Sequence, residues 1–162
     1  MKFPIAIPLL AFAPVVAGQT FAPEHSLTDV LEAAADVFPA DLDGDGDIDV
    51  LLGSGSITWV ENLGGGIFSP AHPISSSPFT PADVQAVDLD GDGDLDVLSR
   101  WQQKARIRIY ENLGQGNFGP VQLLVEKGIH VGATNPVAAD LDGDGDLDVL
   151  LAFSGATGFR VE

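Results

Sequence analysis

Three copies of a nine-residue acidic stretch carry the side chains best suited to chemistry. They lie at residues 41–49, 88–96 and 140–148, and each reads Asp-Leu-Asp-Gly-Asp-Gly-Asp-(Ile or Leu)-Asp. Five carboxylates in nine residues repel one another, so a fold that keeps them side by side needs a cation between them. Oxygen ligands numbering about six or seven favour calcium over zinc, copper or magnesium. The natural interpretation is a calcium loop.

The positions within each loop predict the ligands. Aspartates at positions 1, 3 and 5 are expected to give side-chain oxygens, because the glycines at positions 4 and 6 allow a turn sharp enough for them to converge. Position 7 is expected to give its backbone carbonyl, and position 9 to close the shell. The predicted metal ligands are Asp41, Asp43, Asp45, Asp47 and Asp49; Asp88, Asp90, Asp92, Asp94 and Asp96; and Asp140, Asp142, Asp144, Asp146 and Asp148. We expect about three calcium ions per chain, one in each loop.

Two alternatives to a calcium loop fit part of this pattern. An EF-hand begins in the same way, but it has Glu at position 12 and helices on both sides. Here position 12 is Leu52, Ser99 or Leu151, and the Val-Leu run after each loop favours a strand. The second alternative is a solvated acidic turn without metal. Three copies with identical spacing favour the metal site.

Apolar segments lead into each loop, at residues 37–40, 84–87 and 137–139, and we expect strands there. Another alternating segment, residues 106–110, predicts a strand with its isoleucines on one face. Residues 27–35 have helical composition, but their place ahead of the first loop favours strand and loop.

A second repeated element follows the first two loops. Glu-Asn-Leu-Gly occurs at residues 61–64 and 111–114, followed at matching offsets by Gly, Phe and Pro. Asn-Leu-Gly-x-Gly is turn chemistry, and the Phe after it is expected to begin the next strand. Each repeat is therefore predicted to be a small four-stranded antiparallel sheet. The loops start 47 and 52 residues apart, a period typical of β-propeller blades.

With these motifs the chain resembles the FG-GAP/VCBS repeat family, whose relatives include the propeller of integrin α chains. The resemblance covers roughly residues 27–162. It implies an all-β fold, a partial β-propeller of two to three four-stranded blades, each with a calcium loop. The implied repeat domain spans residues 19–162, with repeats at about 27–70, 71–120 and 121–162. Complete members have about seven blades, more than this chain can form.

Charge and composition limit the classes of molecule that the chain is expected to bind. The net charge is −17, and 15 of the 24 acidic residues lie in the three loops. Three calcium ions would reduce the net charge to −11. This acidity argues against nucleic acid and anionic membranes as partners. Arg100, Lys104, Arg106 and Arg108 form the one basic patch along the chain, which suits a solvated strand face or contact with an anionic glycan or a partner protein. The chain has no cysteine, so in an exported domain metal ions would have to stabilise the fold in place of disulfides.

The N-terminus predicts export. Lys2 precedes an uncharged apolar run that ends in small residues near Ala17 and Gly18, which is typical of a signal peptide over residues 1–18. The alternative is an uncleaved membrane anchor, which Pro4, Pro8 and Pro14 make less attractive as a spanning helix. We expect a secreted or surface-attached protein.

The sequence favours binding over catalysis. His25, His72 and His130 stand alone without transition-metal partners, and no nucleophile motif occurs. The resemblance implies a non-enzymatic module for adhesion or for binding a protein or glycan ligand. The alternative is an accessory, non-catalytic domain of a larger extracellular enzyme.

Two further expectations follow from the repeat pattern. Each metal site draws its ligands from one contiguous loop, so the sites are expected to bind independently to first order, coupled only by blade packing. Residues 160–162 align with 59–61 by their spacing from the loop, so the third repeat stops before its glycine turn. An uncovered blade face favours a longer propeller or association with other copies of the chain.

Overall fold

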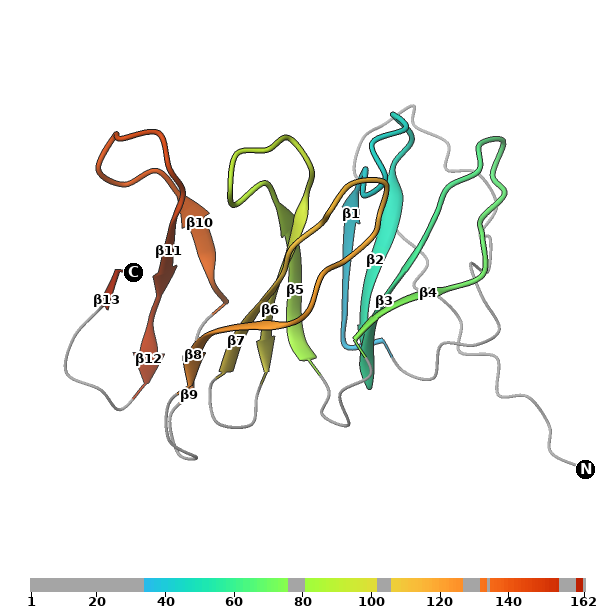
Figure 1. Cartoon of the computed structure of the whole chain (residues 1–162). Helices are drawn as coiled ribbons and strands as arrows, with labels where there is room; N and C mark the ends of the chain where they lie inside the picture. The colour runs from blue at the N-terminus through green and yellow to red at the C-terminus, as the bar shows by residue number, and fades with distance from the viewer. Residues whose placement is uncertain are drawn as a thin grey trace, which may run out of the picture. The chain divides into compact units, whose positions relative to one another are not determined.

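The computed structural model of the chain describes residues 34–75, 81–101, 106–126, 132–133, 135–154 and 160–161 (Figure 1). Every described residue belongs to one compact unit, which starts after residue 30. The predicted signal peptide, residues 1–18, therefore lies outside the described residues. So do most of residues 27–35, His25, Lys104 and His130.

The first two repeats each form a four-stranded antiparallel sheet whose strands pair in chain order. The first sheet contains β1 (Asp36–Ala40), β2 (Asp49–Ser54), β3 (Ser56–Val60) and β4 (His72–Ser75). The second contains β5 (Pro81–Val87), β6 (Asp96–Trp101), β7 (Arg106–Tyr110) and β8 (Gln122–Glu126). The described residues contain no helix. The prediction of an all-β chain, with strands leading into and out of each loop, is confirmed.

The third repeat has five short strands among its described residues. A three-stranded sheet joins β10 (Val137–Ala139), β11 (Asp148–Leu151) and β13 (Arg160–Val161), and β9 (Gly132–Ala133) pairs with β12 (Phe153–Ser154). In this sheet Val161 lies opposite Leu150, and Arg160 lies opposite Leu151. Hairpin length varies between repeats, so counting from the loop does not fix the strand register.

The turn after the third strand differs from prediction in one respect. Phe68 and Phe118 were expected to begin the next strand, but each makes only an isolated bridge, to Asn62 and Asn112. Regular pairing resumes at His72 and Gln122, after a proline that has no N–H to donate to the ladder.

The sheets pack face to face through the alternating side chains of their second strands. In β6, Val97 belongs to a core shared with Leu51 and Trp59 of the first repeat. Its neighbour Leu98 points to the other face and packs in a second core with Val149 of the third repeat. Burial on both faces of β6 explains why Val97 and Leu98 are both apolar instead of alternating with a polar residue.

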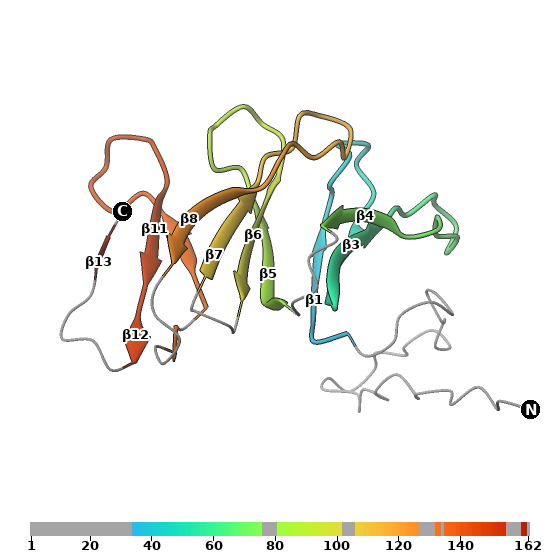
Figure 2. The same ribbon diagram turned by 60° about the horizontal axis from the view of Figure 1, so that its bottom comes forward.

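All three acidic loops join the first strand of a repeat to its second strand, and they project from the same end of the sheets (Figures 1 and 2). The packed sheets thus present the loops on one side.

Candidate metal centres

The first acidic loop is a tight reversal between β1 and β2. Gly44 and Gly46 have φ values of 76° and 97°, in the left-handed region that side chains with a Cβ rarely adopt. The corresponding glycines have φ values of 76° and 99° in the second loop and 82° and 100° in the third. The three loops therefore share one backbone conformation.

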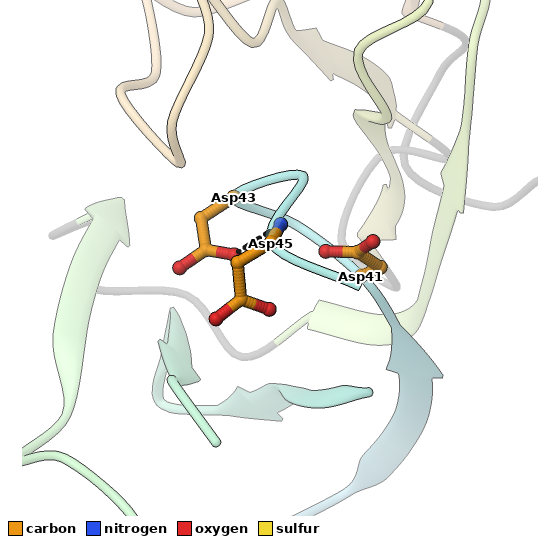
Figure 3. A group of neighbouring side chains, drawn as sticks. All are labelled: Asp41, Asp43 and Asp45. Carbon is orange, nitrogen blue, oxygen red and sulfur yellow. Dashed lines mark hydrogen bonds between the residues drawn. The ribbon is translucent and has the colours of Figure 1, made fainter. Parts of the chain in front are cut away.

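Carboxylates inside each loop hold that conformation. In the first loop Asp41 accepts hydrogen bonds from Gly44 N at 2.9 Å and from Gly46 N at 3.0 Å, one on each oxygen. Asp43 accepts from Asp45 N at 3.1 Å (Figure 3). The equivalent bonds recur in the second and third loops, with distances between 2.7 and 3.2 Å. Each carboxylate has about four acceptor positions, so these bonds leave lone pairs for a cation.

The loops bring three carboxylates together in every repeat. The clusters are Asp41, Asp43 and Asp45; Asp88, Asp90 and Asp92; and Asp140, Asp142 and Asp148. Within each cluster, one oxygen from each side chain lies within 4.8 Å of the others. Figure 3 shows the Asp41 carboxylate directed across the first loop toward Asp43 and Asp45. These clusters could hold metal ions, and their all-oxygen composition fits a hard divalent cation.

One carboxylate of the first cluster, Asp43, is harder to ionise than a free aspartate. Burial is the main cause that raises the pKa of Asp43, and the neighbouring charges of Asp49, Asp45 and Glu61 raise it further. A bound cation would reverse these charge effects, because it favours the ionised form of each carboxylate.

The position-9 aspartates have a second role that the spacing did not predict. Asp49 is fully buried, and its two oxygens accept hydrogen bonds from Leu42 N at 2.9 Å and Asn62 N at 2.8 Å. Asp96 does the same with Leu89 N at 3.0 Å and Asn112 N at 2.8 Å. Each of these carboxylates therefore ties its loop to the turn after the third strand.

The sequence signal for this link is the Glu-Asn-Leu-Gly motif, which recurs after the first two loops. Burial raises the pKa of Asp96 despite the two backbone donors. Asp148 also accepts from Leu141 N, at 3.1 Å. In the third loop it joins the cluster, whereas Asp49 and Asp96 lie outside the tight clusters of their loops.

The remaining predicted ligands lie at the rim of the loops. Asp47 and Asp94 point toward the following turn, where their Oδ2 atoms lie beside Gly64 and Gly114. For position 7 the backbone carbonyl remains the predicted ligand. Asp144 and Asp146 are exposed.

An open hollow of about 580 Å³ adjoins the first loop. Asp43, Asp45, Trp59, Glu61 and His72 line one part of it, and residues 115–117 of the second repeat line the rest. His72 stacks on Trp59 with ring centroids 4.9 Å apart, and its Nε2 lies 3.9 Å from a Glu61 oxygen. His72 is exposed and belongs to none of the three carboxylate clusters.

One residue of the predicted basic patch, Arg108, lies over a tryptophan. The Arg108 guanidinium lies 4.6 Å from the centroid of the Trp101 ring, which is itself buried. A cation over an indole face is attractive, so this arrangement stabilises the strand face whatever else contacts it.

Comparison with known proteins gives one family. The model of the FG-GAP-like repeat matches residues 41–99 and 100–151, while a search of curated proteins finds no match. Within the described residues there is no helix long and apolar enough to cross a membrane. The two matched segments include all three acidic loops and most of the strands between them. The chain belongs to the FG-GAP-like repeat family.

Proposed function

We propose that the chain is a calcium-binding, non-catalytic repeat module in which each acidic loop holds one Ca²⁺. The observation that carries this proposal is the same loop conformation found three times, each with three carboxylates gathered within 4.8 Å. Loops so similar in backbone and hydrogen bonding are expected to share one ligand. FG-GAP-like repeats generally form binding modules rather than enzymes, which agrees with this assignment.

We further propose that the sheets are blades of a partial β-propeller. Three features support this arrangement: sheets whose strands pair in chain order, face-to-face packing, and loops on one side. As members of this family are typically extracellular, the module is proposed to be secreted or surface-attached and to bind a protein or glycan through its loops. An accessory role beside an extracellular catalytic domain is the alternative.

Calcium titration followed by thermal melting tests the metal assignment. A ligand that binds only the folded state with a Kd of about 0.5 mM adds about 1.8 kcal/mol per site at about 10 mM calcium. Three sites would together add about 5 kcal/mol, or a rise of about 10–20 °C in Tm. Identical melting in EDTA and in calcium would contradict the proposal.

Calorimetry should count the sites. We expect about three ions per chain, because each cluster uses one loop. The variants Asp45→Ala, Asp92→Ala and Asp144→Ala should each weaken one site and leave the other two titratable. A stoichiometry of one would mean that two loops do not bind calcium.

A further inference from the structure

One buried side chain hydrogen-bonds two acidic loops at once. Asn112, at the end of the third strand of the second repeat, is only 1% exposed. Its Nδ2 donates to Leu42 O at 2.8 Å and to Leu95 O at 3.1 Å. Leu42 is the second residue of the first loop, and Leu95 is the eighth residue of the second loop. The amide therefore bridges two successive candidate metal centres.

The remaining polar groups of Asn112 fix its orientation. Its Oδ1 accepts from Gly114 N at 3.1 Å, and its backbone N donates to Asp96 Oδ1 at 2.8 Å. The other Asp96 oxygen accepts from Leu89 N, also within the second loop. Asn112 is thus held by its own repeat while it presents one N–H to the repeat before it.

The first repeat provides a natural comparison. Asn62 makes the matching bonds within its own repeat: Nδ2 donates to Ile48 O at 3.1 Å, Oδ1 accepts from Gly64 N, and the backbone N donates to Asp49. Among the hydrogen bonds of the described residues, Asn62 has none to a second loop. The two asparagines therefore differ by the bond that crosses between repeats.

The crossing bond acts where it can position ligands. The Leu42 carbonyl lies between Asp41 and Asp43, two members of the first carboxylate cluster. Leu42 is 1% exposed, whereas its counterpart in the third loop, Leu141, is 50% exposed. The limb of the first loop that carries Asp41 and Asp43 is therefore fixed by the second repeat.

We propose that Asn112 is a positioning residue that couples cation binding in the first two loops. When the carboxylates of the second loop are neutralised and that loop is ordered, Leu95 and Asp96 hold Asn112 in place. Asn112 then holds Leu42, so the first loop has less conformational freedom to lose when its own carboxylates close on a cation. By linkage the effect is reciprocal, so each loop raises the affinity of the other by the same factor. This inference rests on the proposed calcium binding.

The test uses the full chain with Asp140→Ala in every variant, which silences the third loop. The calcium Kd of the first loop is measured by calorimetry with the second loop intact and with it disabled by Asp92→Ala. We expect the Kd to rise about fivefold when the second loop is disabled, toward the lower end of known coupling factors. The matched variant Asn62→Ala should keep this ratio, whereas Asn112→Ala should reduce it to about one.

Hydrogen exchange provides a readout that does not depend on substituting Asn112. At subsaturating calcium, disabling the second loop should speed exchange of the Gly44 and Gly46 amides, which lie in the first loop. If Asn112→Ala does not fold, this experiment still tests whether the first two loops are coupled.

Three outcomes overturn the inference. Calcium binding by the first loop that is indifferent to Asp92→Ala, with unchanged Gly44 exchange, would show that the loops are independent. A ratio that persists in Asn112→Ala would assign the coupling to another contact. No calcium binding by the parent chain would overturn the proposed function itself, which distinguishes the two failures.

Discussion

Gly116 offers the sharpest test of how the second repeat packs on the first. Its φ is 66°, and a Cβ placed on it would clash with Trp59 Cζ2 and lie 2.8 Å from Trp59 Cη2. Trp59 is only 4% exposed and stacks on His72, so its ring has little room to move. Gly66, at the same place in the first repeat, has a φ of 81° and nothing within 4 Å of the added atom.

The two glycines separate backbone strain from packing. Alanine at either position should lose roughly 1–2 kcal/mol for the left-handed conformation. At Gly116 the steric conflict with Trp59 should add about 1–3 kcal/mol, the usual cost of overpacking. We therefore expect Gly66→Ala to lower the free energy of unfolding by roughly 1–2 kcal/mol and Gly116→Ala by roughly 2–5 kcal/mol.

Urea unfolding at saturating calcium measures both losses, with the tryptophan fluorescence as the signal. Each kcal/mol corresponds to about 2–4 °C in Tm for a chain of this length, so thermal melting provides a second measure. Equal losses in the two variants would refute the contact between the second turn and Trp59. Residues 115–117 would then not line the hollow beside the first loop.

Two other predictions concern the buried carboxylates Asp49 and Asp83. In EDTA, Asp49→Ala should lower the free energy of unfolding by about 2–4 kcal/mol, because two backbone N–H groups lose their acceptor. Asp45→Ala should lower the free energy of unfolding by less than about 1 kcal/mol, and its main effect should be a weaker calcium affinity. Similar losses would contradict the structural role of Asp49. Burial and a hydrogen bond shared with Asp36 raise the pKa of Asp83 to about 6. The folded chain therefore keeps a proton that the unfolded chain releases near its ordinary pKa, and this stabilisation is complete below about pH 4 and is lost as pH rises through about 6. Asp83→Asn should remove this loss of stability with rising pH, which is at most about 3 kcal/mol. If the stability of the variant declined between about pH 4 and 7 as steeply as that of the parent, the prediction would be wrong.

The sequence alone predicted the features that depend on neighbouring residues. The Asp and Gly spacing predicted both the sharp reversal and the gathering of carboxylates at positions 1, 3 and 5, as the first two loops show. The Val-Leu run after each loop predicted a strand and excluded an EF-hand. These are local properties, because a turn's φ values and a strand's period of two are set within a few residues.

Only the tertiary structure decided the contacts between distant residues. Asp49 accepts from Asn62, 13 residues away, and Asn112 donates to Leu42, 70 residues away. Like the Asn112 bond, the Asp36 and Asp83 pair and the close approach of Gly116 to Trp59 join different repeats. No local pattern specifies these partners. The Asp49 bond depends on how the strands of one sheet pair, and the other contacts depend on how one sheet packs against the next. The sequence therefore determined the three candidate metal loops, and packing between sheets determined which side chains hold those loops in place.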